Sequence, residues 1–254
     1  MRNKVQLITH VLLLLSLLMS TELYAKQLRV GVSFSMPPYI IDQGPRGIEL
    51  DLIRSAFAGT TYEIVFEYLP VARTFRQFES GKLDAIINVT PGMVDPALLS
   101  APVLIFHNRV FTLNDTHINT LDDLLPLRVV AFQRATDFLG GEFAAMANNN
   151  PRYTETAKQQ AQVSLLLVGR VDAIVLDELI FQYFWAQAQN DVRLKEAFRT
   201  AKIRQADLFP PTYCHFAFHS ADARTLFDRQ LEAMRKDGRY QQIFAAYGVT
   251  PRDP

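Results

Sequence analysis

Seven polar residues stand at or just beyond the ends of predicted strands, where their side chains can contact a small molecule. They are Tyr39, Arg73, Asn88, Thr90, Arg134, Thr136 and Asp177. Guanidinium groups bind carboxylates through paired hydrogen bonds, and a carboxylate accepts hydrogen bonds from an amine. The set predicts the binding of a small polar molecule. No nucleophile paired with a base is apparent in these segments.

The two arginines are candidates for holding an acidic group. Arg73 begins a predicted helix, and Arg134 lies in a loop with Thr136 and the start of the next helix beside it. A helix N-terminus with unpaired N–H groups favours an anion. The alternatives are a surface ion pair of Arg73 with Glu67 or Glu79, and simple solvation of Arg134.

Asp177 is the candidate for contacting an amine. It ends a buried apolar strand, where a carboxylate is costly unless it meets solvent or a cation. The alternative is that it caps the following helix, residues 178–187. Tyr39 follows two prolines in a stiff loop, where it is displayed to a ligand or packs as a lid over the core.

The elements that position these residues are centred on residues 69–90. Val71, Phe75 and Phe78 form one apolar stripe of a short helix, and Gly81 follows at the place of a helix-ending glycine. Residues 83–89 read as a buried strand with Asn88 and Thr90 at its end. Residues 80–87 are echoed by residues 168–175, so we expect an α/β unit used once in each half. The alternative is chance, because short Gly-basic-apolar-Asp-Ala runs are common.

Strands alternate with helices along the rest of the chain. We expect strands at residues 27–33, 62–68, 109–113, 128–132, 153–155, 171–176 and 213–219. We expect a helix over residues 137–147 with Thr136 as its N-cap, and two last helices at 221–236 and 240–247. This order predicts an α/β fold with mainly parallel sheets and a ligand beyond the carboxyl ends of the strands.

Composition excludes several classes of function. The 254 residues are 49% hydrophobic, and 26 basic residues balance 26 acidic ones. A nucleic-acid binder would show a basic excess, so none is expected as a partner. The sequence shows no zinc-type spacing, Walker loop or GxGxxG, so no metal and no cofactor are predicted.

The N-terminus reads as a signal peptide. Arg2 and Lys4 precede an apolar run too short to span a bilayer as a helix, and a small-residue cleavage site ends at Ala25. The signal peptide would direct the protein to the periplasm and be cleaved off after residue 25. The alternative is a retained membrane anchor. Cys214 is the single cysteine, so no internal disulfide can form.

The chain resembles the bacterial extracellular solute-binding proteins that include the periplasmic polar-amino-acid binders. The similar segments are 28–32 with 37–39, 47–52, 81–87, 169–174, 236–240 and 247–248. The resemblance implies two α/β lobes joined by two hinge strands that close on a ligand. Lobe one would be residues 26–112 plus 214–254 and lobe two 113–213, with hinges near 111–113 and 213–216.

The resemblance also implies a function. It points to a monomeric, non-enzymatic receptor for an amino acid or a related amine or acid, which passes its ligand or signal to a membrane permease, as in ABC transport, or to a membrane sensor. Met93 stands where the amino-acid binders carry an arginine that holds the ligand carboxylate. The alternatives are a dehydratase on the same scaffold, with Glu49, Asp177 or Glu178 as its acid, and a ligand-free sensor module.

Overall fold

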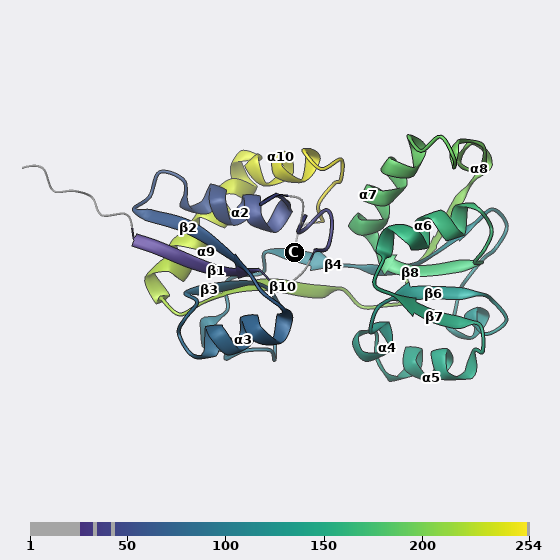
Figure 1. The fold of residues 1–254 in the computed structure, drawn as a ribbon, viewed down its shortest axis with the longest axis horizontal. Coiled ribbons are helices and arrows are strands. Elements are labelled where there is room, and N and C mark those ends of the chain that lie inside the picture. Colours follow the sequence, from purple (N-terminus) through teal and green to yellow (C-terminus); the bar gives the residue numbers. More distant parts are fainter. Residues whose placement is uncertain (1–25, 33–34, 42–43, 253–254) are drawn as a thin grey trace, which may run out of the picture.

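The computed structural model describes residues 26–32, 35–41 and 44–252. Two five-stranded sheets form two lobes, each covered by helices (Figure 1). This arrangement confirms the two-lobed, periplasmic-binding-protein-like α/β fold predicted from the alternation of strands and helices. The predicted signal peptide, residues 1–25, lies outside the described residues.

The first sheet has the strand order β2-β1-β3-β10-β4. Its strands are β1 (Lys26–Val32), β2 (Tyr62–Tyr68), β3 (Ala85–Val89), β4 (Leu104–Phe106) and β10 (Thr212–Phe218). β1 runs parallel to β2 and β3, whereas β10 runs antiparallel to β3 and β4. The helices of this lobe are α2 (Ile48–Phe57), α3 (Val71–Glu79), α9 (Ala221–Asp237), α10 (Arg239–Ala245) and the 3-10 turn η1 (Pro96–Leu98).

The second sheet has the strand order β7-β6-β8-β5-β9. Its strands are β5 (Asn108–Leu113), β6 (Val129–Phe132), β7 (Tyr153–Thr156), β8 (Ala173–Asp177) and β9 (Ile203–Ala206). β6, β7 and β8 are parallel, so their carboxyl ends meet at one edge. The helices are α4 (Ala135–Phe138), α5 (Gly141–Asn149), α6 (Gln159–Leu167), α7 (Glu178–Gln189), α8 (Lys195–Thr200) and the 3-10 turn η2 (Asp122–Leu124).

The sequence repeat is also a structural repeat. In the first lobe the backbone N–H and the guanidinium of Arg29 donate to the carboxylate of Asp84, and Nη2 of Arg29 also donates to the carbonyl of Gly81. The equivalent residues of the second lobe make the same bonds: Arg128, Asp172 and Gly169. Gly81 and Gly169 have φ values of 70° and 67°, a backbone region that favours glycine. The echo therefore marks one α/β unit in each lobe.

Strand pairing shows that the chain passes between the lobes at other residues than the sequence predicted. β5 pairs with β8 and β9 from Asn108 onward, so the strand expected to end lobe one belongs to the second sheet. β10 pairs with β4 from Thr212. The chain therefore crosses at His107 and again at residues 207–211. An apolar run such as Val110–Phe111 marks a strand but does not reveal which sheet it joins.

The helix expected over residues 137–147 is two helices. α4 ends at Phe138 and α5 begins at Gly141, with Gly140 between them at φ 91°. A glycine at positive φ breaks the helical path. Thr136 consequently lies inside α4 and is not the N-cap of a longer helix.

Candidate functional site

The carboxyl edges of the two sheets face each other. Tyr39 lies in the loop after β1, and its hydroxyl donates a 2.8 Å hydrogen bond to Oδ1 of Asp177 at the end of β8. The Tyr39 ring is fully buried and packs edge-to-face on Phe106, with ring centroids 4.9 Å apart. Two predicted site residues, one from each lobe, are thus brought into direct contact.

The Asp177 carboxylate accepts four hydrogen bonds within the protein. Besides Tyr39, it accepts hydrogen bonds from the backbone N–H groups of His107, Leu179 and Ile180, at 2.8 to 3.2 Å. Burial raises its pKa to about 6, and these hydrogen bonds oppose the rise. The capping alternative is confirmed, because Leu179 and Ile180 are the first-turn donors of α7. The contact with a ligand amine stays a prediction.

A partly buried ion network joins the two crossings, and sequence patterns did not predict it. Arg109 Nε lies 3.2 Å from Glu178 Oε2, and Arg109 Nη2 lies 3.4 Å from Asp207 Oδ2. His107 Nε2 lies 2.7 Å from Asp207 Oδ1. Arg252, from the C-terminal segment, lies 3.0 Å from Glu178 Oε2. The network therefore ties the first crossing, the second crossing, α7 and the chain end together.

The start of α4 is occupied by a carboxylate of the protein itself. Glu155 accepts hydrogen bonds from the backbone N–H groups of Arg134 and Thr136 and from the Thr136 hydroxyl. The Arg134 guanidinium is paired with Asp137 at 2.8 Å. The donor hydrogen bonds hold the pKa of Glu155 below its usual value despite some burial. The donors predicted to hold a ligand anion here are already satisfied, and their contact with a ligand stays a prediction.

Asn88 and Thr90 lie at the carboxyl end of β3, half-buried. Asn88 has φ 58°, a conformation that asparagine tolerates better than most residues. The carbonyl of Thr90 accepts from the backbone N–H of Met93, which closes a turn that leaves the Met93 side chain exposed. Both predicted residues therefore lie close to the facing edge. Their contact with a ligand stays a prediction.

Arg73 is exposed in the first turn of α3. Its backbone N–H bonds to the carbonyl of Pro70, but its guanidinium makes no hydrogen bond or ion pair with any described residue. The alternative ion pair with Glu67 or Glu79 is absent from the described part of the chain. Arg73 is thus a cation available at the end of β2.

Glu49 is a buried acid whose state the sequence did not predict. Its side chain is fully buried in α2, and neither oxygen has a hydrogen-bond partner among the described residues. Burial alone raises its pKa to about 8. A carboxyl in this position stays protonated at neutral pH in the folded protein.

Residues 28–250 match the sequence model described as bacterial extracellular solute-binding proteins, family 3. The chain belongs to this family. The match confirms the resemblance inferred from the sequence and spans both lobes of this solute-binding protein. No match is found among curated proteins.

Solved structures share the fold of this solute-binding protein. A histidine kinase sensor domain with similarity to periplasmic binding proteins is 20% identical at TM-score 0.63, covering 90% of this chain and 99% of that chain. The substrate-binding protein of an amino acid ABC transporter is 16% identical at TM-score 0.57, covering 87% and 98%. An ancestral amino acid-binding protein, described as a precursor of cyclohexadienyl dehydratase, is 21% identical at TM-score 0.59, covering 87% and 94%. At these identities the likeness shows the fold alone.

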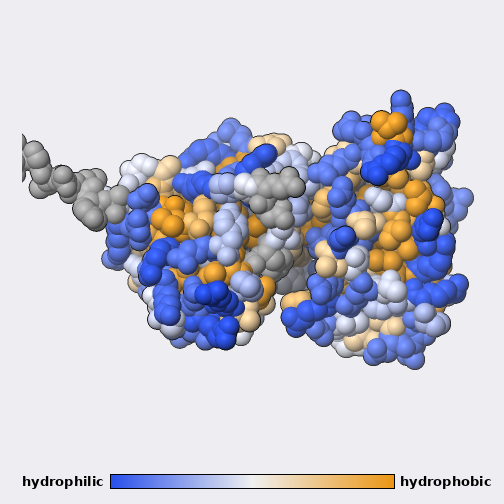
Figure 2. Space-filling view, in the orientation of Figure 1, coloured by the Kyte–Doolittle hydropathy of each residue, from blue (hydrophilic) through white to orange (hydrophobic). Residues whose placement is uncertain are grey.

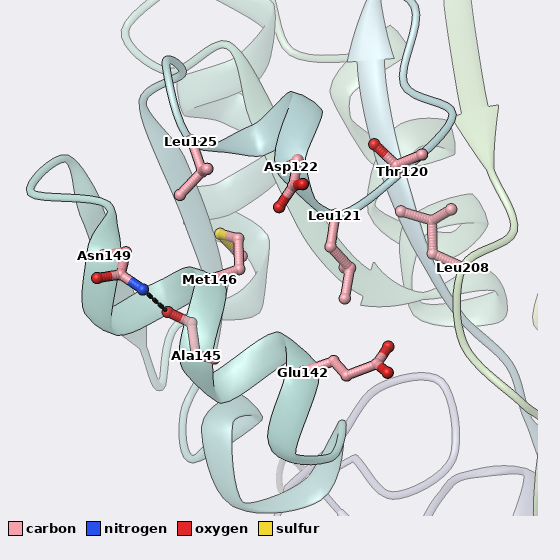
Figure 3. A pocket seen from close by; sticks show the side chains of 9 residues that line it. All are labelled: Thr120, Leu121, Asp122, Leu125, Glu142, Ala145, Met146, Asn149 and Leu208. Atoms are coloured by element: carbon pink, nitrogen blue, oxygen red, sulfur yellow. Dashed lines mark hydrogen bonds between the residues drawn. The ribbon is translucent and has the colours of Figure 1, made fainter.

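A hollow on the surface of the solute-binding protein lies away from the facing edges. It sits on the surface of the second lobe between η2 and α5 (Figure 3). Its lining residues are Thr120, Leu121, Asp122, Leu125, Glu142, Ala145, Met146, Asn149 and Leu208. None of the seven predicted site residues contributes to it, so we do not place the ligand there.

Two further features bear on the class of protein. No group of three or more described His, Cys, Asp or Glu side chains is arranged to hold a metal ion. Among helices of the described residues, none combines the length and apolar character needed to cross a bilayer.

Proposed function

We propose that this solute-binding protein is an exported periplasmic receptor. It captures a small polar ligand, an amino acid or a related amine or acid, between its lobes for uptake or sensing. The observation that carries the proposal is the facing of the two carboxyl edges, held by the Tyr39–Asp177 hydrogen bond across the lobes. In open α/β sheets, ligands bind beyond the carboxyl ends of the strands. Two such edges facing each other offer a ligand two walls.

Closure around the ligand would turn the lobes about the crossings at His107 and residues 207–211. Few residues absorb the change in such hinge motions. Figure 2 shows a notch between the lobes on the side of α3 and α4. The partner of the closed form would be a membrane permease or a membrane sensor. Similar structures include both a transporter's binding protein and a kinase sensor domain, so each kind of membrane partner has support.

Small-angle X-ray scattering tests this function. The folded protein is measured alone and then with separate pools of amino acids, oligopeptides, polyamines and organic acids. The proposal expects the radius of gyration to fall with at least one pool, because the lobes approach each other on binding. A folded protein whose scattering is unchanged by every pool would instead support the ligand-free sensor module.

A dehydratase on this scaffold is the second candidate, because one similar structure is described as a dehydratase precursor. Dehydration needs an acid within hydrogen-bond reach of the substrate. Glu49 is fully buried, and the Asp177 carboxylate already accepts four hydrogen bonds. We therefore expect no aromatic product when the protein is incubated with prephenate. Product formation above an Asp177→Asn control would establish the enzyme.

A further inference from the structure

Exposed apolar side chains gather at the facing edges. Large hydrophobic side chains that are at least two-fifths exposed include Tyr68 (49%), Val71 (44%) and Met93 (41%) in the first lobe and Phe138 (57%) in the second. Tyr213 (44%) is the second residue of β10, which runs antiparallel to β3 and so starts at the same edge. Exposed apolar side chains that cluster in one place mark binding surfaces, whereas single ones need no explanation.

The first-lobe members of this cluster lie together. β2 and β3 both run parallel to β1, so Tyr68 at the end of β2 and Met93 after β3 are on one edge. Leu69 and Val94, their chain neighbours, pack on the same buried cluster around Phe78. Tyr68, Val71 and Met93 therefore all lie at the carboxyl edge of the first sheet, which is the first-lobe wall of the site.

The opposite wall carries an aromatic ring. Phe138 is in α4, directly after the carboxyl end of β6, and its ring lies 6.5 Å from that of Phe132. The Arg134 guanidinium lies over the Phe138 ring at 5.4 Å. Because the carboxyl ends of β6 and β8 share an edge, Phe138 is on the side that faces the first lobe.

The charges beside these walls are unequal. Arg73, two residues beyond Val71, has a guanidinium without a partner among the described residues. Four described second-lobe acids at this edge have partners: Glu155 at the start of α4, Asp137 with Arg134, Asp177 with Tyr39 and three backbone groups, and Glu178 with Arg109 and Arg252. The edge thus offers a cation to a ligand anion, and these four carboxylates already have partners.

We propose that the ligand is a small monocarboxylic acid with an aromatic or apolar body and no α-ammonium group. This inference rests on the proposed receptor function and narrows its ligand class. The carboxylate pairs with Arg73, a charge-assisted contact, and the body packs on Tyr68, Val71, Met93 and Phe138. A zwitterionic amino acid would bring its ammonium group beside second-lobe carboxylates that already have partners, and burying an incompletely paired charge is unfavourable.

Isothermal titration calorimetry with three compounds of one skeleton tests the proposal. The probes are 3-phenylpropanoate, L-phenylalanine and 2-phenylethylamine, which carry the acid, both groups and the amine. We expect 3-phenylpropanoate to bind at least tenfold more tightly than the other two. Equal or tighter binding of L-phenylalanine overturns the proposal.

Two arginine variants locate the carboxylate. Arg73→Ala should weaken 3-phenylpropanoate binding at least tenfold, whereas Arg76→Ala, one helical turn further along α3, should leave it unchanged. Equal losses in both variants, or none in Arg73→Ala, overturn the proposal. Circular dichroism and melting temperature check that both variants fold.

The ligand class and the receptor function fail in different ways. If 3-phenylpropanoate, benzoate, hexanoate and indole-3-acetate all fail to bind while a pool of amino acids or polyamines closes the lobes in scattering, the ligand class is overturned and the receptor function stands. If no pool closes the lobes, both are overturned.

Discussion

The Tyr39 hydroxyl and the Asp177 carboxylate form a buried hydrogen bond between the lobes, with 2.8 Å between the two oxygens. It joins the loop after β1 to the end of β8, and the two residues are 138 positions apart in the chain. This hydrogen bond holds the loop that carries Tyr39 against the end of β8. A lobe movement that separates Tyr39 from Asp177 must break this hydrogen bond.

Tyr39→Phe removes this hydroxyl while keeping the ring against Phe106. A hydrogen bond to a charged group contributes about 1.5–3 kcal/mol, so we expect a loss of free energy of unfolding in that range. Urea denaturation measures it. Tyr183→Phe is the control, because the Tyr183 hydroxyl has no hydrogen bond to a described residue, and it should change stability by well under about 1 kcal/mol. Equal stability of Tyr39→Phe and wild type would show that the link contributes nothing.

Glu49 predicts an unusual dependence of stability on pH. In the folded protein its carboxyl stays protonated to about pH 8, whereas its ordinary pKa is 4.5. Between these values unfolding releases a proton, so the free energy of unfolding falls as the pH rises. The pKa of Glu49 differs by roughly 3.5 units between the unfolded and folded states, and each unit corresponds to about 1.4 kcal/mol. The loss of unfolding free energy across this pH range is therefore at most about 5 kcal/mol.

Glu49→Gln isolates this effect, because glutamine has no proton to lose. Urea denaturation of wild type and variant at pH 5 and pH 8.5 should show wild type losing more stability on the alkaline side than Glu49→Gln. Glu63→Gln, an exposed change of the same charge on β2, should track wild type at both pH values. Parallel pH profiles for wild type and Glu49→Gln would contradict the buried protonated state.

The ion network at the crossings predicts a contrast between a buried and an exposed partner. Glu178→Gln removes the negative charge beside Arg109, whose side chain is only 8% exposed, and leaves this buried cation partly unpaired. We expect a loss on the order of 3 kcal/mol. Arg252→Ala removes a partner whose side chain is 47% exposed and should cost below about 1 kcal/mol. Thermal and urea unfolding of both variants test this order, which a larger loss in Arg252→Ala would reverse.

Local patterns in the sequence predicted much of the fold. The apolar stripe of α3, the glycine after it and the buried strand β3 are adjacent in the chain, and their periods identify them. The repeat around Asp84 and Asp172 was readable for the same reason. The assignment of β5 to the second sheet was not, because its partners β8 and β9 are distant in the chain.

The candidate site was predicted in its location more than in its contacts. Strand ends placed Tyr39 and Asp177 at the facing edges, but their bond depends on how two lobes meet. Glu155 was not predicted as part of the site, because it reaches the start of α4 from β7, a neighbouring strand of the sheet. His107, Arg109 and Asp207 likewise form a network only when both crossings come together, which no local spacing reveals.

Met93→Arg tests whether an added guanidinium creates an amino-acid site. The resemblance places an arginine at this position in amino-acid binders, yet the acids that would accept the ammonium are engaged here. We expect no gain in affinity for any common L-amino acid by calorimetry. Val192→Arg, an 86% exposed valine away from the facing edges, is the matched control. A gain specific to Met93→Arg would show that the ligand is an ordinary α-amino acid.

The central claim is that this solute-binding protein holds a small ligand between its lobes, and a thermal-shift screen tests it most directly. A ligand at a hundredfold excess over its dissociation constant stabilises the folded state by about 2.7 kcal/mol. For a chain of this size each kcal/mol raises the melting temperature by about 2–4 °C. The account predicts a rise of several degrees with at least one small acid, reduced in Arg73→Ala and kept in Arg76→Ala. A folded protein whose melting temperature no compound of a broad library raises would contradict it.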